Sequence, residues 1–97
     1  MRRALSLLLV SIAVAACTTP PVQEMSDARQ AIAAAEQANA GKVAPESLSD
    51  ARRFLADAER QIQQEAYGSA RMNAVRAKNR ASQALRASQA PAEPKDR

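Results

Sequence analysis

The chain has 97 residues, with 14 Lys and Arg against 10 Asp and Glu, one Cys, and neither His nor Trp. A chain of this length holds one domain at most. The absence of His excludes zinc fingers, Cys-His proteases, Ser-His hydrolases and haem sites, and a single Cys forms no internal disulfide. Phe54 and Tyr67 are the only aromatic residues, too few for a platform on which sugars or bases stack.

The N-terminal segment is organised like a secretory signal. Met1, Arg2 and Arg3 form a short basic start, and an apolar run follows from Ala4 to Ala16. This run is shorter than the stretch of about 20 apolar residues that crosses a membrane as a helix, and it ends in small residues. We therefore predict a signal peptide over residues 1–16 that is removed on export.

The end of this segment, Val14, Ala15, Ala16 and Cys17, resembles the lipobox of bacterial lipoproteins. The resemblance implies cleavage before Cys17 and attachment of diacylglycerol and an N-acyl chain such as palmitate to it, so that residues 17–23 form a lipidated tether. Two or three acyl chains anchor a protein stably to a membrane. Thr18 stands where Asp retains a lipoprotein in the inner membrane, which implies the periplasmic face of the outer membrane in a Gram-negative source. A plain signal peptide with an incidental Cys, or an uncleaved anchor, is the alternative.

Three helices are predicted in the remainder, because it is rich in Ala, Glu, Gln and Arg. Gly41 suits the position after a helix, and Pro45 suits the first turn of the next one. A second, weaker break is Glu65-Ala66-Tyr67-Gly68, around the only other glycine. The predicted helices cover about residues 24–40, 45–64 and 68–89 of a helical domain over residues 24–90. Residues 91–97 are expected to form a disordered tail.

Each predicted helix has one stripe of apolar or small residues at three-four spacing, which is the seam of packed or coiled helices. Short breaks make consecutive helices antiparallel neighbours. We predict an all-α fold, either an antiparallel helical hairpin or a three-helix unit, with an alanine-rich, coiled-coil-like seam. The first helix either packs on the hairpin or detaches as part of the tether. The seam consists of Met25, Ala28, Ile32, Ala35 and Asn39, then Leu48, Ala51, Leu55, Ala58 and Ile62, then Tyr67, Ala70, Ala74, Ala77, Ala81, Ala84 and Ser88.

An internal repeat links the first two predicted helices. Residues 26–36 and 49–59 both read S-D-A-R-x-x-(I/L)-A-x-A-E. A fainter third copy covers residues 69–78, where Ala74 replaces the aliphatic residue and Lys78 replaces the Glu. Chance similarity within an alanine-rich chain is the alternative interpretation.

Charge is segregated along the chain. Residues 23–65 include eight acidic and five basic residues, whereas residues 66–90 include five basic residues and no acidic one. One interpretation of these bases, which lie opposite the alanine seam in a helical projection, is a solvated face partly paired with Asp50, Asp57 or Glu59. The other is a docking stripe for an acidic protein, an anionic lipid or a wall polymer. The candidate interaction face consists of Arg71, Met72, Val75, Arg76 and Arg80.

Residues 25–87 resemble a family of small bacterial envelope lipoproteins whose helical domain is known as domain of unknown function 4398. The resemblance rests on Ser26-Asp27-Ala28-Arg29, on Ala44-Pro45-Glu46-Ser47-Leu48 and on Tyr67 followed by Ala70-Arg71. It implies a helical domain in the cell envelope. The family has no established activity, so the resemblance implies no mechanism.

Two hypotheses of different classes follow. The first is a non-catalytic interaction module, held by its lipid at the outer membrane and facing the periplasm, whose candidate face contacts an envelope protein. The alternative is a structural lipoprotein of the alanine-zipper type that self-assembles as a spacer between membrane and wall, although Gly41, Pro45 and Gly68 interrupt the heptads of such a rod. Contact with the wall is compatible with both, but the end Lys95-Asp96-Arg97 predicts no covalent link to it. We expect no catalytic residues, no metal site, no cofactor besides the covalent lipid, and no nucleic-acid partner.

Overall fold

The computed structural model describes residues 19–90, and this part of the chain is helical almost throughout. It contains the helices α2 (Val22–Gln37), α3 (Ala40–Val43), α4 (Pro45–Gln63) and α5 (Tyr67–Gln89), and no strand between residues 19 and 90. The predicted all-α fold is confirmed. None of these helices combines the length and the apolar character needed to cross a membrane. The predicted signal peptide with Val14, Ala15 and Ala16, the lipidation residue Cys17 and the tail over residues 91–97 lie outside the described residues.

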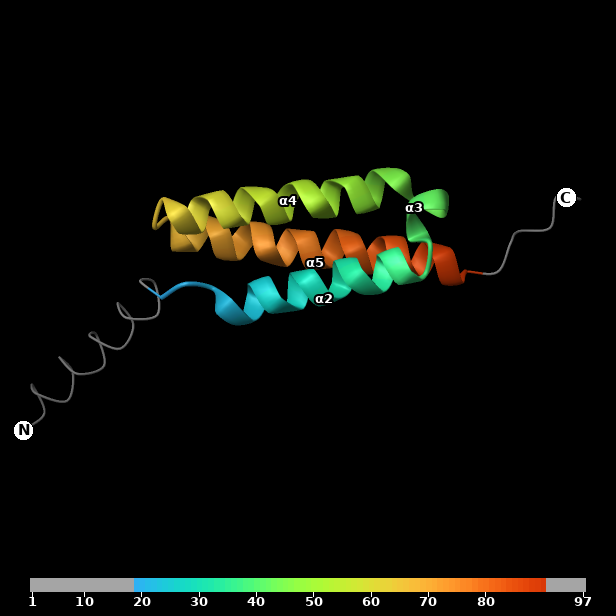
Figure 1. Cartoon of the computed structure of the whole chain (residues 1–97), viewed down its shortest axis with the longest axis horizontal. Helices are drawn as coiled ribbons and strands as arrows, with labels where there is room; N and C mark the ends of the chain where they lie inside the picture. Colours follow the sequence, from blue (N-terminus) through green and yellow to red (C-terminus); the bar gives the residue numbers. More distant parts are fainter. Residues whose placement is uncertain (1–18, 91–97) are drawn as a thin grey trace, which may run out of the picture.

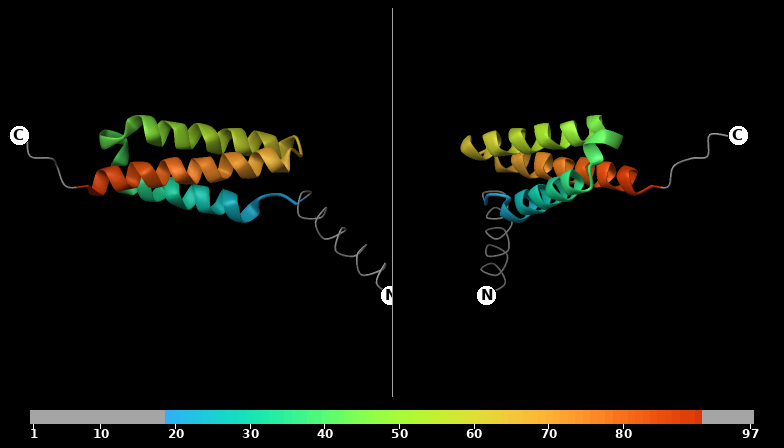
Figure 2. Two further views of the ribbon diagram at one scale, coloured as in Figure 1. Left: turned by 180° about the vertical axis from the view of Figure 1, so that it is seen from behind. Right: turned by 45° about the vertical axis from the view of Figure 1, so that its right-hand side comes forward.

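Helix α5 is the centre of the fold. It runs antiparallel to α4 and parallel to α2, and it packs along both, whereas α2 and α4 contact each other much less (Figure 1). The other views show the three long helices side by side, with α3 at the end where α2 leads into α4 (Figure 2). Of the two predicted arrangements, the three-helix unit is therefore the observed one. The first helix packs on the hairpin of α4 and α5 and does not detach from it.

The turn after α2 is formed by a residue that the sequence prediction did not select. Helix α2 ends at Gln37, before the predicted residue 40, and Asn39 adopts the left-handed conformation with φ 55°. Its N–H donates to the carbonyl of Glu36 at 3.1 Å. This role had been given to Gly41, which lies instead inside the one-turn helix α3. Asn accepts the left-handed conformation more readily than other non-glycine residues, so it ends the helix first.

The turn between α4 and α5 has the hydrogen bonds of a Schellman motif. The N–H of Ala66 donates to the carbonyl of Gln61 at 2.8 Å, and the N–H of Glu65 donates to the carbonyl of Ile62 at 3.0 Å. Glu65 is the left-handed residue, with φ 59°. Gly68, expected at this break, lies in the first turn of α5, where an added Cβ would meet nothing within 4 Å. The break therefore depends on Glu65 and not on the glycine.

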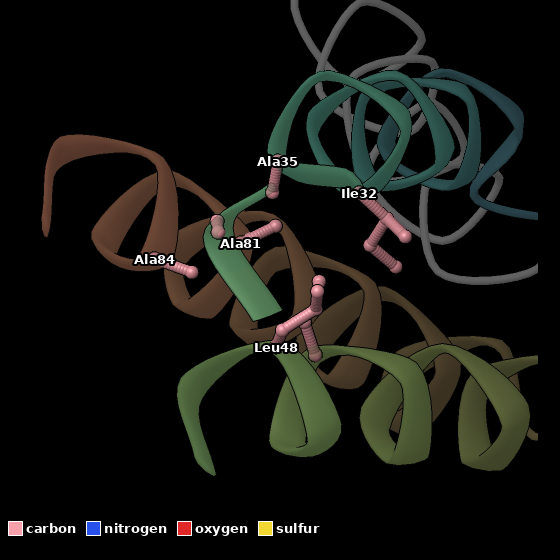
Figure 3. Close-up of a cluster of buried hydrophobic side chains, with 7 residues drawn as sticks. Ile32, Ala35, Leu48, Ala81 and Ala84 are labelled. Atoms are coloured by element: carbon pink, nitrogen blue, oxygen red, sulfur yellow. The ribbon is translucent and has the colours of Figure 1, made fainter. Parts of the chain in front are cut away.

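The core joins large side chains of α2 and α4 to small ones of α5. The main cluster includes Ile32 of α2, Leu48 of α4 and Ala81 of α5 (Figure 3). A second cluster, nearer the turn between α4 and α5, includes Met25 of α2 and Ala74 of α5. Because alanine is small, α5 approaches both neighbours closely, and their longer side chains fill the space between the helices.

The predicted seam is confirmed, since Asn39 is its only exposed member among the seventeen. Leu55, Ile62, Tyr67 and Ser88 are half-buried. The buried members are Met25, Ala28, Ile32, Ala35, Leu48, Ala51, Ala58, Ala70, Ala74, Ala77, Ala81 and Ala84.

The two clear copies of the repeat pair with each other across α2 and α4. Nη2 of Arg29 in the first copy lies 3.5 Å from Oε1 of Glu59 in the second, and Nη2 of Arg52 in the second lies 3.1 Å from Oε1 of Glu36 in the first. Arg is the fourth residue and Glu the eleventh in both copies. Antiparallel copies centred on each other therefore form the same ion pair twice. This reciprocity favours a true repeat over chance similarity in an alanine-rich chain.

Candidate functional site

Salt bridges use most of the acidic side chains in residues 19–90. Five of the eight carboxylates in this range are paired, at nitrogen–oxygen distances between 2.8 and 3.5 Å. Asp50, Asp57 and Glu59, which were possible partners for the bases of α5, pair with other residues instead. The expected pairing is therefore wrong, whereas the bases Arg76, Lys78, Arg80 and Arg86 are exposed, as a solvated face requires. The five pairs are Arg29–Glu59, Arg52–Glu36, Arg53–Asp50, Arg60–Asp57 and Arg71–Glu24.

The basic side chains outside these salt bridges are concentrated on α5. Within residues 19–90 there are five of them, Lys42, Arg76, Lys78, Arg80 and Arg86, and all except Lys42 belong to α5. Their clustering raises the local positive potential, because no carboxylate of the described chain neutralises them.

The nearest partners of two of these cations are neutral. Nη1 of Arg76 donates to Oδ1 of Asn73 at 3.3 Å, and Nη1 of Arg80 donates to Oε1 of Gln83 at 3.4 Å. Both acceptors are amides on α5 itself, three residues away. An amide orients the guanidinium without neutralising it, so the charge stays available to a partner.

Two exposed apolar side chains lie beside these cations. Met72 is 53% exposed and Val75 is 42% exposed, although both belong to the middle of a helix whose opposite side is buried. We define the outer α5 face as seven exposed residues on the side of α5 away from the alanine seam. It consists of Met72, Val75, Arg76, Asn79, Arg80, Gln83 and Arg86.

Four of the five residues predicted for the interaction face belong to the outer α5 face, and Arg71 does not. Its side chain is only 34% exposed, and its Nε donates to Oε1 of Glu24 on α2 at 3.3 Å. Its Nη2 also donates to the carbonyl oxygen of Thr19, just before α2, at 3.3 Å. Arg71 therefore lies at the contact between α5 and α2, where it holds the start of α2 against α5.

A polar contact between α4 and α5 was missed by the sequence reasoning. Nδ2 of Asn73 donates to Oε1 of Gln61 at 2.9 Å, and the pair is partly buried. No signal in the sequence indicates this contact, because it depends on the register of the two helices; the structure pairs Ala58 with Ala74 in one cluster, and the antiparallel run then brings residue 61 close to residue 73. This hydrogen bond adds a polar link between α4 and α5 beside the buried alanine seam.

The described residues carry their polar chemistry on the surface. No polar or charged side chain between residues 19 and 90 is buried, and no group of three potential metal ligands occurs there. What the arrangement offers is adhesion, since the outer α5 face combines positive charge with a small apolar area. Such a surface attracts an anionic, partly apolar one.

Comparison with known proteins identifies a family but no characterised relative. The sequence model of a family described as a domain of unknown function (DUF4398) matches residues 23–96. No curated protein matches the chain, and no solved structure matches it. The family match covers more than half of the chain and, within residues 19–90, includes α3, α4, α5 and all of α2 except Val22.

Proposed function

The chain belongs to the DUF4398 family of domains of unknown function, and from its own residues we propose that it is a non-catalytic interaction module. In this proposal lipid on Cys17 anchors the protein to the outer membrane, and the helical unit faces the periplasm. The outer α5 face contacts an envelope protein. The proposal includes no resident cofactor, metal or nucleic-acid partner.

The observation that carries the proposal is that the basic residues of α2 and α4 form salt bridges, whereas most of those on α5 do not. The single basic residue of α2 and all three basic residues of α4 pair with carboxylates of the same chain, whereas four of the five on α5 do not. Three of these four, Arg76, Arg80 and Arg86, belong to the outer α5 face together with the exposed Met72 and Val75. A cationic surface with an apolar area is typical of a docking face, since charge guides the encounter and apolar burial holds the complex.

The alanine-zipper alternative has less support. A zipper between chains needs the alanine seam as its interface. Here Ala70, Ala74, Ala77, Ala81 and Ala84 are all 0% exposed, because α2 and α4 of the same chain cover them. Self-assembly would have to use a different surface, and the outer α5 face of one copy repels that of another.

Photo-crosslinking in intact cells tests the interaction role. A photoreactive residue is placed at Met72 of the full chain, and the control probe replaces Ala56, an exposed residue of α4. We expect a discrete adduct with a second protein from position 72 and none from position 56. Adducts with this chain alone, or equal adducts from both positions, would contradict the interaction module, and the former would favour the spacer.

The lipid anchor is tested separately. When the full chain is produced in a Gram-negative bacterium with an alkyne analogue of palmitate, we expect labelling of the wild type and none of Cys17→Ala. Thr18→Asp is the matched control, because it keeps the acylated Cys while changing the sorting residue. We expect the wild type in the outer-membrane fraction and Thr18→Asp in the inner-membrane fraction. An unlabelled wild type overturns the anchor.

A further inference from the structure

The outer α5 face is specific enough to indicate what kind of partner fits it. Resting on the proposed function, we infer that the docking element of the partner is an acidic amphipathic helix that lies along α5. The inference commits to a protein helix with carboxylates at three-four spacing. It excludes an anionic lipid surface and a second copy of this chain.

The shape of the face matches a helix. Met72, Arg76, Asn79, Gln83 and Arg86 recur at intervals of three and four residues, the spacing by which the alanine seam of the same helix packs against its neighbours. The stripe extends over about 21 Å of a straight helix, at 1.5 Å per residue. A helix laid along such a stripe meets one of its side chains at every turn.

The order of residues along the outer α5 face specifies the chemistry of the partner. Apolar residues stand at its start, Met72 and Val75, and cations follow at Arg76, Arg80 and Arg86. A complementary helix therefore presents apolar residues at one end and carboxylates along the remainder. Asn79 stands in the middle, where one polar residue in a helical interface sets the register of the two helices.

A membrane surface fits the face poorly. Interfacial helices insert a continuous apolar face, usually with large aromatic or aliphatic residues, into the boundary of headgroups and acyl chains. On the outer α5 face the two apolar side chains occupy one end only, and each is already about half covered. Charge alone would then hold the protein to the lipid, without selecting the stripe.

A second copy of the chain also fits poorly. Two outer α5 faces packed together bring Arg76, Arg80 and Arg86 of both copies into one interface without any carboxylate. The carboxylates of residues 19–90 that remain outside salt bridges are Asp27, Glu46 and Glu65. They belong to α2, to α4 and to the turn before α5, so they form no stripe that could oppose the cations.

The test combines the Met72 crosslink with charge reversal and rescue. The crosslinked residue of the partner is mapped by mass spectrometry, and Arg76→Glu with Arg80→Glu is introduced into the full chain carrying the Met72 probe. We expect the adduct yield to fall at least about tenfold, since two attractive pairs become repulsive. Reversing the facing carboxylates of the mapped partner helix to Lys should restore the yield.

Matched variants keep the test decisive. Lys42→Glu with Arg60→Glu gives the same change in net charge away from the outer α5 face, and the adduct yield should stay unchanged. Arg76→Gln with Arg80→Gln removes the positive charge without adding repulsion, and we expect an intermediate yield. Helix content, measured by circular dichroism, should be nearly equal in all of these variants, because Arg76 and Arg80 bond only to neighbours on α5 and the exposed Arg60 pairs only with Asp57 on α4.

The outcomes separate this inference from the proposed function. A protein adduct that survives both Arg76→Glu and Arg80→Glu leaves the interaction module standing and overturns the acidic helix. An adduct that maps to a loop, or to lipid, overturns it as well. Failure of Met72 to crosslink any second protein overturns the proposed function itself.

Discussion

The two sides of helix α5 have the same three-four spacing of residues, but one side is buried in the core and the other is exposed. The inner side is alanine at every buried position, and it is covered by Ile32 of α2 and Leu48 of α4. The outer side repeats the three-four pattern with longer, exposed residues, among them the apolar Met72 and the cationic Arg76. The difference teaches that packing against α2 and α4 stabilises α5. The residues on the outer side are therefore not needed for the packing of the core.

The largest expected effect on stability comes from removing a large side chain that packs against the inner side of α5. Leu48→Ala removes a side chain that is 2% exposed and faces Ala81 and Ala84, and alanines cannot fill the space. We expect a loss of about 3 kcal/mol in the free energy of unfolding. Denaturant unfolding of a soluble form, lacking residues 1–16 and carrying Cys17→Ser, measures it by circular dichroism.

Val75→Ala is the matched substitution on the outer side, and it should lower the free energy of unfolding by less than about 0.5 kcal/mol. Equal losses in the two variants would contradict the division between the two sides.

Filling the inner side should be the next largest effect. Ala81→Leu forces extra carbon atoms between α5 and its neighbours, where Ala81 is 0% exposed, and we expect a loss of about 2 kcal/mol. Gln83→Leu places the same residue two positions further on, at an exposed site, and should change the stability by less than about 0.5 kcal/mol. The same unfolding measurement applies. If Ala81→Leu left the stability unchanged, the close approach of the helices would not depend on alanine.

A substitution in the turn between α4 and α5 should stabilise the protein. Glu65 holds a left-handed conformation that suits glycine, so Glu65→Gly should raise the free energy of unfolding by up to about 1 kcal/mol. Gly68→Ala is the matched change inside α5, and it should stabilise by a similar amount, since the added Cβ meets nothing within 4 Å. Thermal unfolding of both variants measures the gain. A loss of stability in Glu65→Gly would mean that the Glu side chain holds the turn by a contact of its own.

The sequence predicted the inner side of α5 much better than the outer one. Burial follows helical periodicity, so a stripe such as Ala70 to Ala84 indicates the core without any tertiary information. The end of the first helix was less accurate, because the left-handed turn falls at Asn39 and not at Gly41. The second left-handed turn, at Glu65, lies within the predicted break over residues 65–68.

Ion pairs between helices could not be predicted, since they depend on the register and rotation of the packed helices. The pairing of Arg71 with Glu24 joins residues 47 positions apart in the chain. In a helical projection, a shift of one residue turns the side chain by about 100°, which is the difference between Arg71 at the α2 contact and Met72 on the outer α5 face.

The smallest expected effect tests this placement of Arg71. Arg71→Gln removes the ion pair with Glu24 and the hydrogen bond to the Thr19 carbonyl, and we expect a loss of about 0.5 kcal/mol because the pair is one-third exposed. Faster amide exchange should be confined to the first turn of α2, which Arg71 holds against α5. Arg76→Gln is the matched change on the outer α5 face, and it should alter neither the stability nor the exchange of α2, since its partner Asn73 belongs to α5. Should both variants loosen α2 equally, net charge rather than contact would account for the effect. The two arginines would then belong to one surface, as their sequence alone suggests.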